Sequence, residues 1–136
     1  MKVVLDTNIY LSGLAFPKSI PRKVLELAKA RKFKVFCSKF ILEEIKKNLM
    51  VKFGYSESLS GRFIEEILKF TRIIVPKVKL QIIKEKAADN RILEVALTSR
   101  ADFLISGDKK HILPLKKINS TMILSAKEFF TKVQIR

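Results

Sequence analysis

Apolar positions along the chain change their spacing in a regular order. Short apolar runs of strand length alternate with longer segments in which apolar residues recur at the spacing of a helix face. The strand-like runs are KVVLD, FKVFCS, RIIVPKV, DFLIS and TMILS, at residues 2–6, 33–38, 72–78, 102–106 and 121–125. Runs that are apolar on both faces are typical of parallel strands covered by helices. The pattern therefore predicts an alternating α/β chain.

Helical spacing predicts the segments that connect these strands. Pro21 lies where a helix often begins, Ser38 is a plausible N-cap, and Pro76 is expected to end its strand or to place it at an edge. We expect one α/β domain over residues 1–136, with helices on both faces of a mainly parallel sheet in three layers. The predicted helices span 21–30, 38–53, 58–71, 89–100, 108–115 and 126–133.

Composition supports a single folded domain and gives no sign of secretion or membrane insertion. The 136 residues are 48% hydrophobic, and no apolar run approaches the roughly 18 residues of a membrane span. Asp6 interrupts the apolar start of the chain, which argues against a signal peptide. The single cysteine, Cys37, lies in an apolar run and is expected to be a buried core residue. We expect a cytoplasmic protein.

The charge balance is strongly basic. The chain has 28 Lys and Arg residues against 13 Asp and Glu residues, for a formal net charge of +15. A field of this sign attracts polyanions, and nucleic acid is the commonest one inside cells. A lysine-rich solvated surface, as some thermophilic proteins carry, is the alternative explanation. Charge therefore favours a nucleic-acid partner but says nothing about catalysis.

Four acidic residues are predicted to meet at one edge of the sheet. Asp6 ends the first strand, Asp108 follows the fourth, and Asp89 shares the buried stripe of its helix with apolar residues. Glu44 lies on the flank of another inward-facing stripe, whereas Glu43 points nearly the opposite way. The carboxyl ends of parallel strands and the N-termini of the covering helices lie at the same edge, where such folds place their functional groups.

Each acid also has a purely structural explanation. Asp89 and Asp108 could be helix N-caps, and Glu43 and Glu44 could pair with residues one turn further along the helix. Taken together, however, converging carboxylates repel one another, and a divalent cation relieves that repulsion. Oxygen ligands favour Mg²⁺ or Mn²⁺ over Zn²⁺, and such a site in a basic chain suits phosphodiester hydrolysis. Whether Glu43 replaces Glu44 stays open.

Four motifs occur in an order that resembles a known family. VVLDTN, SKFILEEIKKNL, ADNRILEVAL and ADFLISGDKKHIL together cover almost the whole chain. This pattern is similar to that of PIN-domain ribonucleases, and most of all to VapC-like toxin components of toxin–antitoxin pairs. The resemblance implies a five-stranded parallel sheet with strand order 3-2-1-4-5.

The resemblance also implies the activity and its residues. Asp6, Glu44, Asp89 and Asp108 would bind one or two Mg²⁺ or Mn²⁺ ions and cleave RNA endonucleolytically. The positions of Asn8 and Ser106 match those that hold the acids by hydrogen bonds. The implied partners are RNA, a cognate antitoxin protein and a second copy of the chain in a homodimer. The chain departs from the family pattern in one respect: Ala87 and Ala88 stand where relatives often carry further acids, so Asp89 would act without a neighbouring acid.

Cations beside the acids are expected to contact RNA phosphates, which carry little sequence information. His111, one turn past Asp108, is expected at a surface or cap position, although a general base is conceivable. Two other functions remain open: a PIN-like module that binds RNA or protein without cutting, and a structure-specific DNA nuclease. The candidate RNA-binding residues are Lys18, Arg22, Lys23, Arg91, Lys109 and Lys110.

Overall fold

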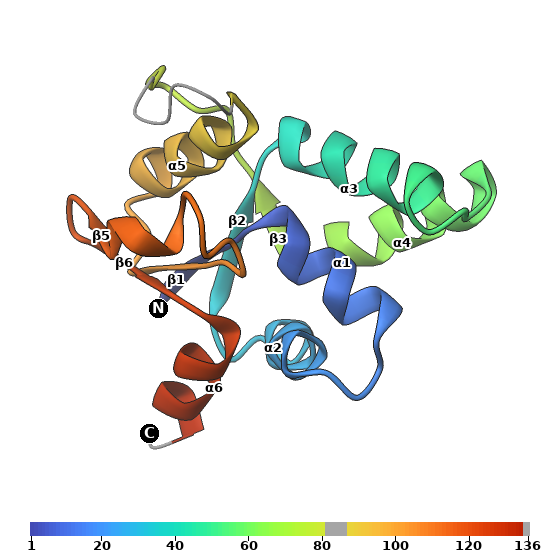
Figure 1. Cartoon of the computed structure of the whole chain (residues 1–136), viewed down its shortest axis with the longest axis horizontal. Coiled ribbons are helices and arrows are strands. Elements are labelled where there is room, and N and C mark those ends of the chain that lie inside the picture. The colour runs from blue at the N-terminus through green and yellow to red at the C-terminus, as the bar shows by residue number, and fades with distance from the viewer. Residues whose placement is uncertain (81–86, 135–136) are drawn as a thin grey trace.

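A six-stranded sheet forms the centre of the computed structural model, which describes residues 1–80 and 87–134 (Figure 1). The strand order within this part of the chain is β3-β2-β1-β4-β6-β5. Neighbouring strands are parallel except for β5 and β6, which pair antiparallel. The strands are β1 (Lys2–Leu5), β2 (Lys34–Cys37), β3 (Thr71–Ile73), β4 (Phe103–Ile105), β5 (Lys117–Ile118) and β6 (Thr121–Leu124).

Five of these strands are the ones that the sequence predicts, and they stand in the expected order. The addition is β5, two residues long, which forms a hairpin with β6 at the edge of the sheet. Asn119 in the hairpin turn has a φ of 51°, a left-handed conformation that asparagine tolerates better than most residues. The strand predicted over 72–78 is shorter than expected and ends before Pro76, which has no N–H for a ladder.

Helices pack on both sides of the sheet. Helix α5 contacts β1 and β2 on one side, whereas α1 lies between α2 and α3, and α6 packs against α2. Figure 1 shows α5 and the group formed by α1, α3 and α4 on opposite sides of the strands, in three layers. The helices are α1 (Thr7–Ala15), α2 (Ile20–Lys29), α3 (Lys39–Val51), α4 (Glu57–Leu68), α5 (Ala87–Ser99) and α6 (Ala126–Gln134).

Helix α1 is not among the helices predicted from the sequence. It begins directly after β1, with Asp6 as its N-cap, and it is buried at Ile9, Tyr10, Leu11 and Gly13. No residue of α1 is fully exposed, because α2 and α3 cover it on two sides. The apolar residues therefore lack the helical period on which the prediction depended.

The segment predicted as a helix over 108–115 is mostly a series of turns. Only Leu113–Leu115 forms a short 3₁₀-helix, η1. The backbone N–H of Leu113 donates to the carbonyl of Asp108 at 2.9 Å, but Pro114 cannot donate, so an α-helical ladder does not continue. This irregular loop carries Asp108 and His111.

The core is built around β1, which lies between its parallel neighbours β2 and β4. Val3, Val4 and Leu5 are fully buried, and each contributes about 1.5–3 kcal/mol relative to an exposed side chain. Cys37 is buried as predicted, and burial raises the pKa of its thiol to about 12, which keeps it neutral. Across the ranges described, none of the helices has the length and apolar character that a membrane span requires.

Helix α1 approaches α2 closely at Gly13. A Cβ built on Gly13 would overlap Cδ1 of Leu25 and lie 3.2 Å from the carbonyl carbon of Pro21. Leu25 is 1% exposed and has little room to move. We therefore expect Gly13→Ala to lower the free energy of unfolding by about 1–3 kcal/mol, measured by urea denaturation.

Gly61 provides the matched control, because it also lies inside a helix but has no neighbouring atom within 4 Å of an added Cβ. Gly61→Ala should raise the free energy of unfolding by roughly 0.5–1 kcal/mol through the lost chain entropy of glycine. Equal effects of the two substitutions would contradict the close helix contact at Gly13.

Candidate active site

A cavity of about 610 Å³ opens at the carboxyl edge of the sheet. All four acids singled out from the sequence, Asp6, Glu44, Asp89 and Asp108, line it. They come from the junction of β1 and α1, from α3, from the first turn of α5 and from the loop after β4. The fold thus brings together four carboxylates that are separated by up to about a hundred positions in the sequence.

Asp6 is the most deeply buried of these acids, with 5% of its surface exposed. Its Oδ1 accepts a hydrogen bond from the Thr7 backbone N–H at 2.7 Å, and its Oδ2 accepts one from the Ser106 hydroxyl at 2.6 Å. Burial raises the pKa of Asp6 from its usual 3.8 to about 6, and the charges of Asp89 and Asp108 act in the same direction. The two hydrogen bonds lower this pKa, but burial outweighs them.

Ser106 connects the first acid to the loop that carries the fourth. Its side chain donates to Asp6 and accepts from the backbone N–H of Asp108 at 3.0 Å. Asn8 supports the same loop, because its Oδ1 accepts from the backbone N–H of Gly107 at 3.1 Å. Ser106 therefore contacts an acid directly, whereas Asn8 holds the backbone beside one.

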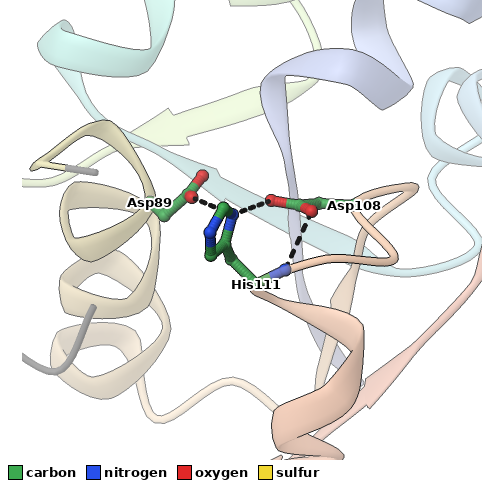
Figure 2. A group of neighbouring side chains, drawn as sticks. All are labelled: Asp89, Asp108 and His111. Carbon is green, nitrogen blue, oxygen red and sulfur yellow. Dashed lines mark hydrogen bonds and ion pairs between the residues drawn. The ribbon is translucent and has the colours of Figure 1, made fainter. Parts of the chain in front are cut away.

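Asp108 is held by the turn that follows it. Its Oδ1 accepts from the backbone N–H groups of Lys110 at 2.9 Å and His111 at 3.0 Å. Both bonds are made by Oδ1. The other carboxylate oxygen, Oδ2, faces Nδ1 of His111 (Figure 2). The side chain of Asp108 is 20% exposed and remains accessible to a ligand.

His111 lies between two of the acids, and not at the surface position expected from the sequence. Its Nδ1 is 3.8 Å from Oδ2 of Asp89 and 3.9 Å from Oδ2 of Asp108. Figure 2 shows the imidazole between the first turn of α5 and the loop after β4. The sequence placed His111 one turn past Asp108 on an assumed helix, but the actual chain turns back toward α5.

The neighbouring residues Glu44 and Glu43 on α3 have different environments. Glu44 lines the cavity and is half-buried, with Oε2 3.4 Å from the side-chain amide of Asn48. Glu43 is exposed and forms a long ion pair with Lys39 at 4.0 Å. The acid that belongs to the cavity is therefore Glu44.

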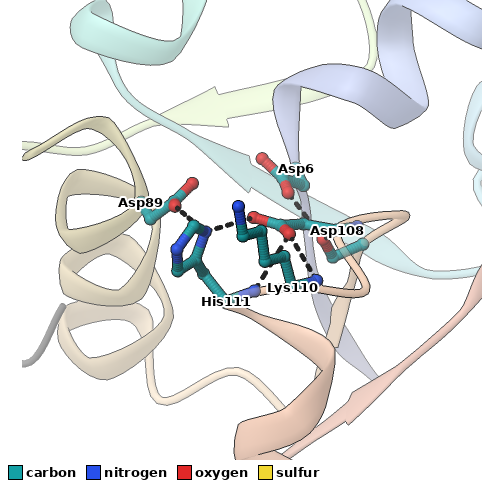
Figure 3. A network of polar contacts seen from close by, with 6 residues as sticks. Asp6, Asp89, Asp108, Lys110 and His111 are labelled. Atoms are coloured by element: carbon teal, nitrogen blue, oxygen red, sulfur yellow. Dashed lines mark hydrogen bonds and ion pairs between the residues drawn. The ribbon is translucent and has the colours of Figure 1, made fainter. Parts of the chain in front are cut away.

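The candidate RNA-binding cations fall into two groups. Lys109 and Lys110 line the cavity, and Figure 3 shows Lys110 extending from its loop toward the acids. Lys52, which the sequence analysis did not select, also lines it. The remaining candidates, Lys18, Arg22, Lys23 and Arg91, do not.

Arg22 and Arg91 have structural partners instead. Arg22 donates to the Gly13 carbonyl at 2.9 Å and lies 3.5 Å from the carboxylate of Glu26. Arg91 pairs with buried Glu94 at 2.7 Å and donates to the carbonyl of Leu80 at 3.1 Å. Both guanidinium groups hold elements of the fold together and lie outside the cavity lining, so their contact with RNA stays a prediction.

Comparisons with known proteins identify the family. A family model described as PIN domain matches residues 2–110, which include every acid of the cavity. The chain is 33% identical over 113 residues to the uncharacterized protein MJ1680 of Methanocaldococcus jannaschii, covering 80% of this chain and 72% of that protein.

A solved structure shares the fold. It is VapBC2 from Rickettsia felis bound to a DNA fragment from its promoter, with a TM-score of 0.66 and 19% sequence identity. The match covers 90% of this chain and 97% of that chain. From the length of the matched model and the identity to the archaeal relative, we conclude that the chain belongs to the PIN domain family.

Proposed function

We propose that this protein is a metal-dependent endoribonuclease that hydrolyses RNA phosphodiesters, and a toxin of the VapC kind. PIN domains are generally nucleases that use divalent metal ions. The observation that carries the proposal is the convergence of Asp6, Glu44, Asp89 and Asp108 on one open cavity. These acids lie in a chain with a formal net charge of +15, as expected for a polyanionic substrate.

The electrostatics of Asp6 support a cation in this cavity. A pKa of about 6 means that ionised Asp6 costs roughly 3 kcal/mol in the metal-free fold, at 1.36 kcal/mol per pKa unit. A positive charge bound beside Asp6 would favour the ionised carboxylate and offset this cost. The four acids offer the hard oxygen ligands that suit Mg²⁺ or Mn²⁺, as one or two ions.

The protein's own residues would position the reacting groups. A bound cation would polarise the phosphoryl oxygen and lower the pKa of a bound water. Asp6, fixed through Ser106 and the N-terminus of α1, would hold its ligand oxygens in place, and Asp108 would do so from the opposite loop. Glu44 lies across the cavity on α3, where it can bind a second ion or accept a proton from water.

Lysines around the cavity would bind the RNA backbone. Lys52, Lys109 and Lys110 lie in its lining, whereas Lys18, in the loop after α1, and Lys23, in α2, are exposed outside it. Such contacts would anchor phosphates with little sequence preference, and single strands or loops fit an open cavity best.

A protein partner and a second copy are part of the proposal. The related fold from Rickettsia felis was solved as a VapBC2 complex, and we propose a cognate antitoxin and a homodimer for this chain as well. A PIN-like module that binds without cutting and a DNA nuclease are the competing outcomes of the first experiment below.

The first prediction concerns cleavage of end-labelled structured RNA in the presence of Mn²⁺. Asp6→Asn and Glu44→Gln should each lower the rate at least about a hundredfold, because each removes an anionic ligand, and chelator should abolish cleavage. Glu43→Gln is the matched control, since Glu43 is the exposed neighbour of Glu44 on α3. Its rate should stay within about twofold of wild type.

Three results would redirect the proposal. Binding of RNA by the wild type without any metal-dependent cleavage, after removal of co-purified protein, would favour the binding module. Cleavage of a matched branched DNA in preference to RNA would favour the DNA nuclease. Loss of activity in Glu43→Gln but not in Glu44→Gln would reverse the assignment on α3.

The second prediction concerns stability and pH without metal. Because folding raises the pKa of Asp6, its ionisation destabilises the fold progressively from about pH 4 to pH 6. Asp6→Asn keeps an N-cap but cannot ionise. Its free energy of unfolding should therefore rise relative to that of the wild type by roughly 2–3 kcal/mol between pH 4 and pH 6, and the difference should stay constant at higher pH. Urea denaturation at several pH values measures the difference, which Mn²⁺ should reduce. A difference that does not change with pH would contradict the buried ionisation.

The third prediction concerns RNA affinity. Lys109→Gln combined with Lys110→Gln should reduce the salt dependence of single-strand binding by about 1–1.5 in log–log slope, because two phosphate contacts are lost. Lys32→Gln combined with Lys34→Gln removes the same charge near the start of β2, at the opposite edge of the sheet, and is the control. Fluorescence anisotropy with an inactive Asp6→Asn background measures both. Equal losses would mean that net charge alone attracts RNA.

A further inference from the structure

Three side chains with metal-ligating atoms converge on one side of the cavity: Asp89, Asp108 and His111. Their ligand atoms all lie within 4.8 Å of one another. The side chains are 14%, 20% and 16% exposed, so each is shielded from bulk water while still lining the cavity. This arrangement adds a nitrogen to a site that the sequence predicts to be made of oxygens alone.

The distances favour a shared cation over direct contact. Nδ1 of His111 is 3.8 Å from Asp89 and 3.9 Å from Asp108, which is too long for a hydrogen bond in either case. Ligand atoms that each lie about 2.0–2.2 Å from one ion are themselves roughly 3–4 Å apart. The spacing around Nδ1 lies near the upper limit for an ion pair and within the range expected for ligands of one ion.

The backbone holds the imidazole in this orientation. The N–H of His111 donates to Oδ1 of Asp108 at 3.0 Å, and Oδ2 of the same carboxylate faces Nδ1 (Figures 2 and 3). The turn thus fixes both the carboxylate and the ring from one loop. Such support from hydrogen bonds to the ligands is a general property of metal sites.

We propose that Nδ1 of His111 is a direct ligand of the divalent cation that Asp89 and Asp108 bind, and that it makes the site prefer Mn²⁺ over Mg²⁺. Imidazole is a good ligand for transition metals, whereas Mg²⁺ strongly prefers oxygen. The proposal rests on the proposed function only in that the cavity must bind a divalent cation. It makes His111 part of the metal site and leaves the acids to serve as the other ligands.

The decisive experiment is pulsed electron paramagnetic resonance of Mn²⁺ bound to tag-free protein. His111 is the single histidine of the chain, so any imidazole nitrogen coupled to the bound ion must come from it. We expect electron spin-echo modulation from imidazole nitrogen in the wild type and none in His111→Asn. This measurement does not depend on RNA cleavage.

Metal affinities provide the second measurement. His111→Asn replaces the nitrogen by an amide group, so Mn²⁺ binding should weaken at least about tenfold while Mg²⁺ binding, measured by competition, changes much less. His111→Gln is the second variant, and Glu43→Gln is the control, with wild-type affinities for both ions. Circular dichroism establishes that each variant is folded.

The outcomes separate this inference from the proposed function. Mn²⁺ bound to the wild type without nitrogen coupling would overturn the role of His111 and leave the four-acid nuclease intact. Equal Mn²⁺ affinities of the wild type and both His111 variants would also overturn the role of His111 as a ligand. If those variants nevertheless cleaved RNA more slowly, the result would point to His111 as a general base. No binding of either ion by the wild type would overturn both proposals.

Discussion

The parallel pairing of β1 with β4 is the constraint on which the candidate site depends. It places Leu5 opposite Ile105, so the residues that follow each strand leave the sheet at the same point. From there the Ser106 hydroxyl bonds to Asp6, a hundred positions away in the sequence, and to the backbone of Asp108. A shift of this register by one residue would turn the buried side chains to the other face and separate the two acids.

The sequence was sufficient to predict the sheet and the four acids but not the details of the loops. The convergence of Asp6 and Asp108 followed from apolar runs that end beside polar residues, a pattern that does not require tertiary contacts to interpret. The strand order, in contrast, was implied by the resemblance to PIN-domain ribonucleases. Helix α1 was missed because neighbours bury it on several sides, although Asp6 before Thr7 was an available N-cap signal. His111 was misplaced because the bonds that turn its loop toward α5 are specific to the folded state.

The roles of the basic residues also could not be predicted from the sequence. Charge counts identified a cationic chain, but spacing could not distinguish lysines that face the cavity from arginines that serve the fold. Arg91 illustrates the difference, because buried Glu94 also accepts a hydrogen bond from the backbone of Leu80 at 2.7 Å and so gathers the guanidinium and a loop together. The position of an arginine next to a candidate catalytic acid in the sequence therefore does not show that the arginine contacts the substrate. Its guanidinium group can instead pair with an acid on the same helix, as Arg91 does with Glu94.

The central place of β1 has a consequence for synthesis on the ribosome. Strand β1 needs β4 as a neighbour, and the site needs Asp108, so about a hundred further residues must be synthesised before Asp6 meets its partners. At roughly 5–20 residues per second this interval lasts on the order of 5–20 s. A nascent chain therefore carries the first acid long before it has the complete cavity, and an incomplete chain that stops before β4 lacks both Asp108 and the strand that positions it beside Asp6.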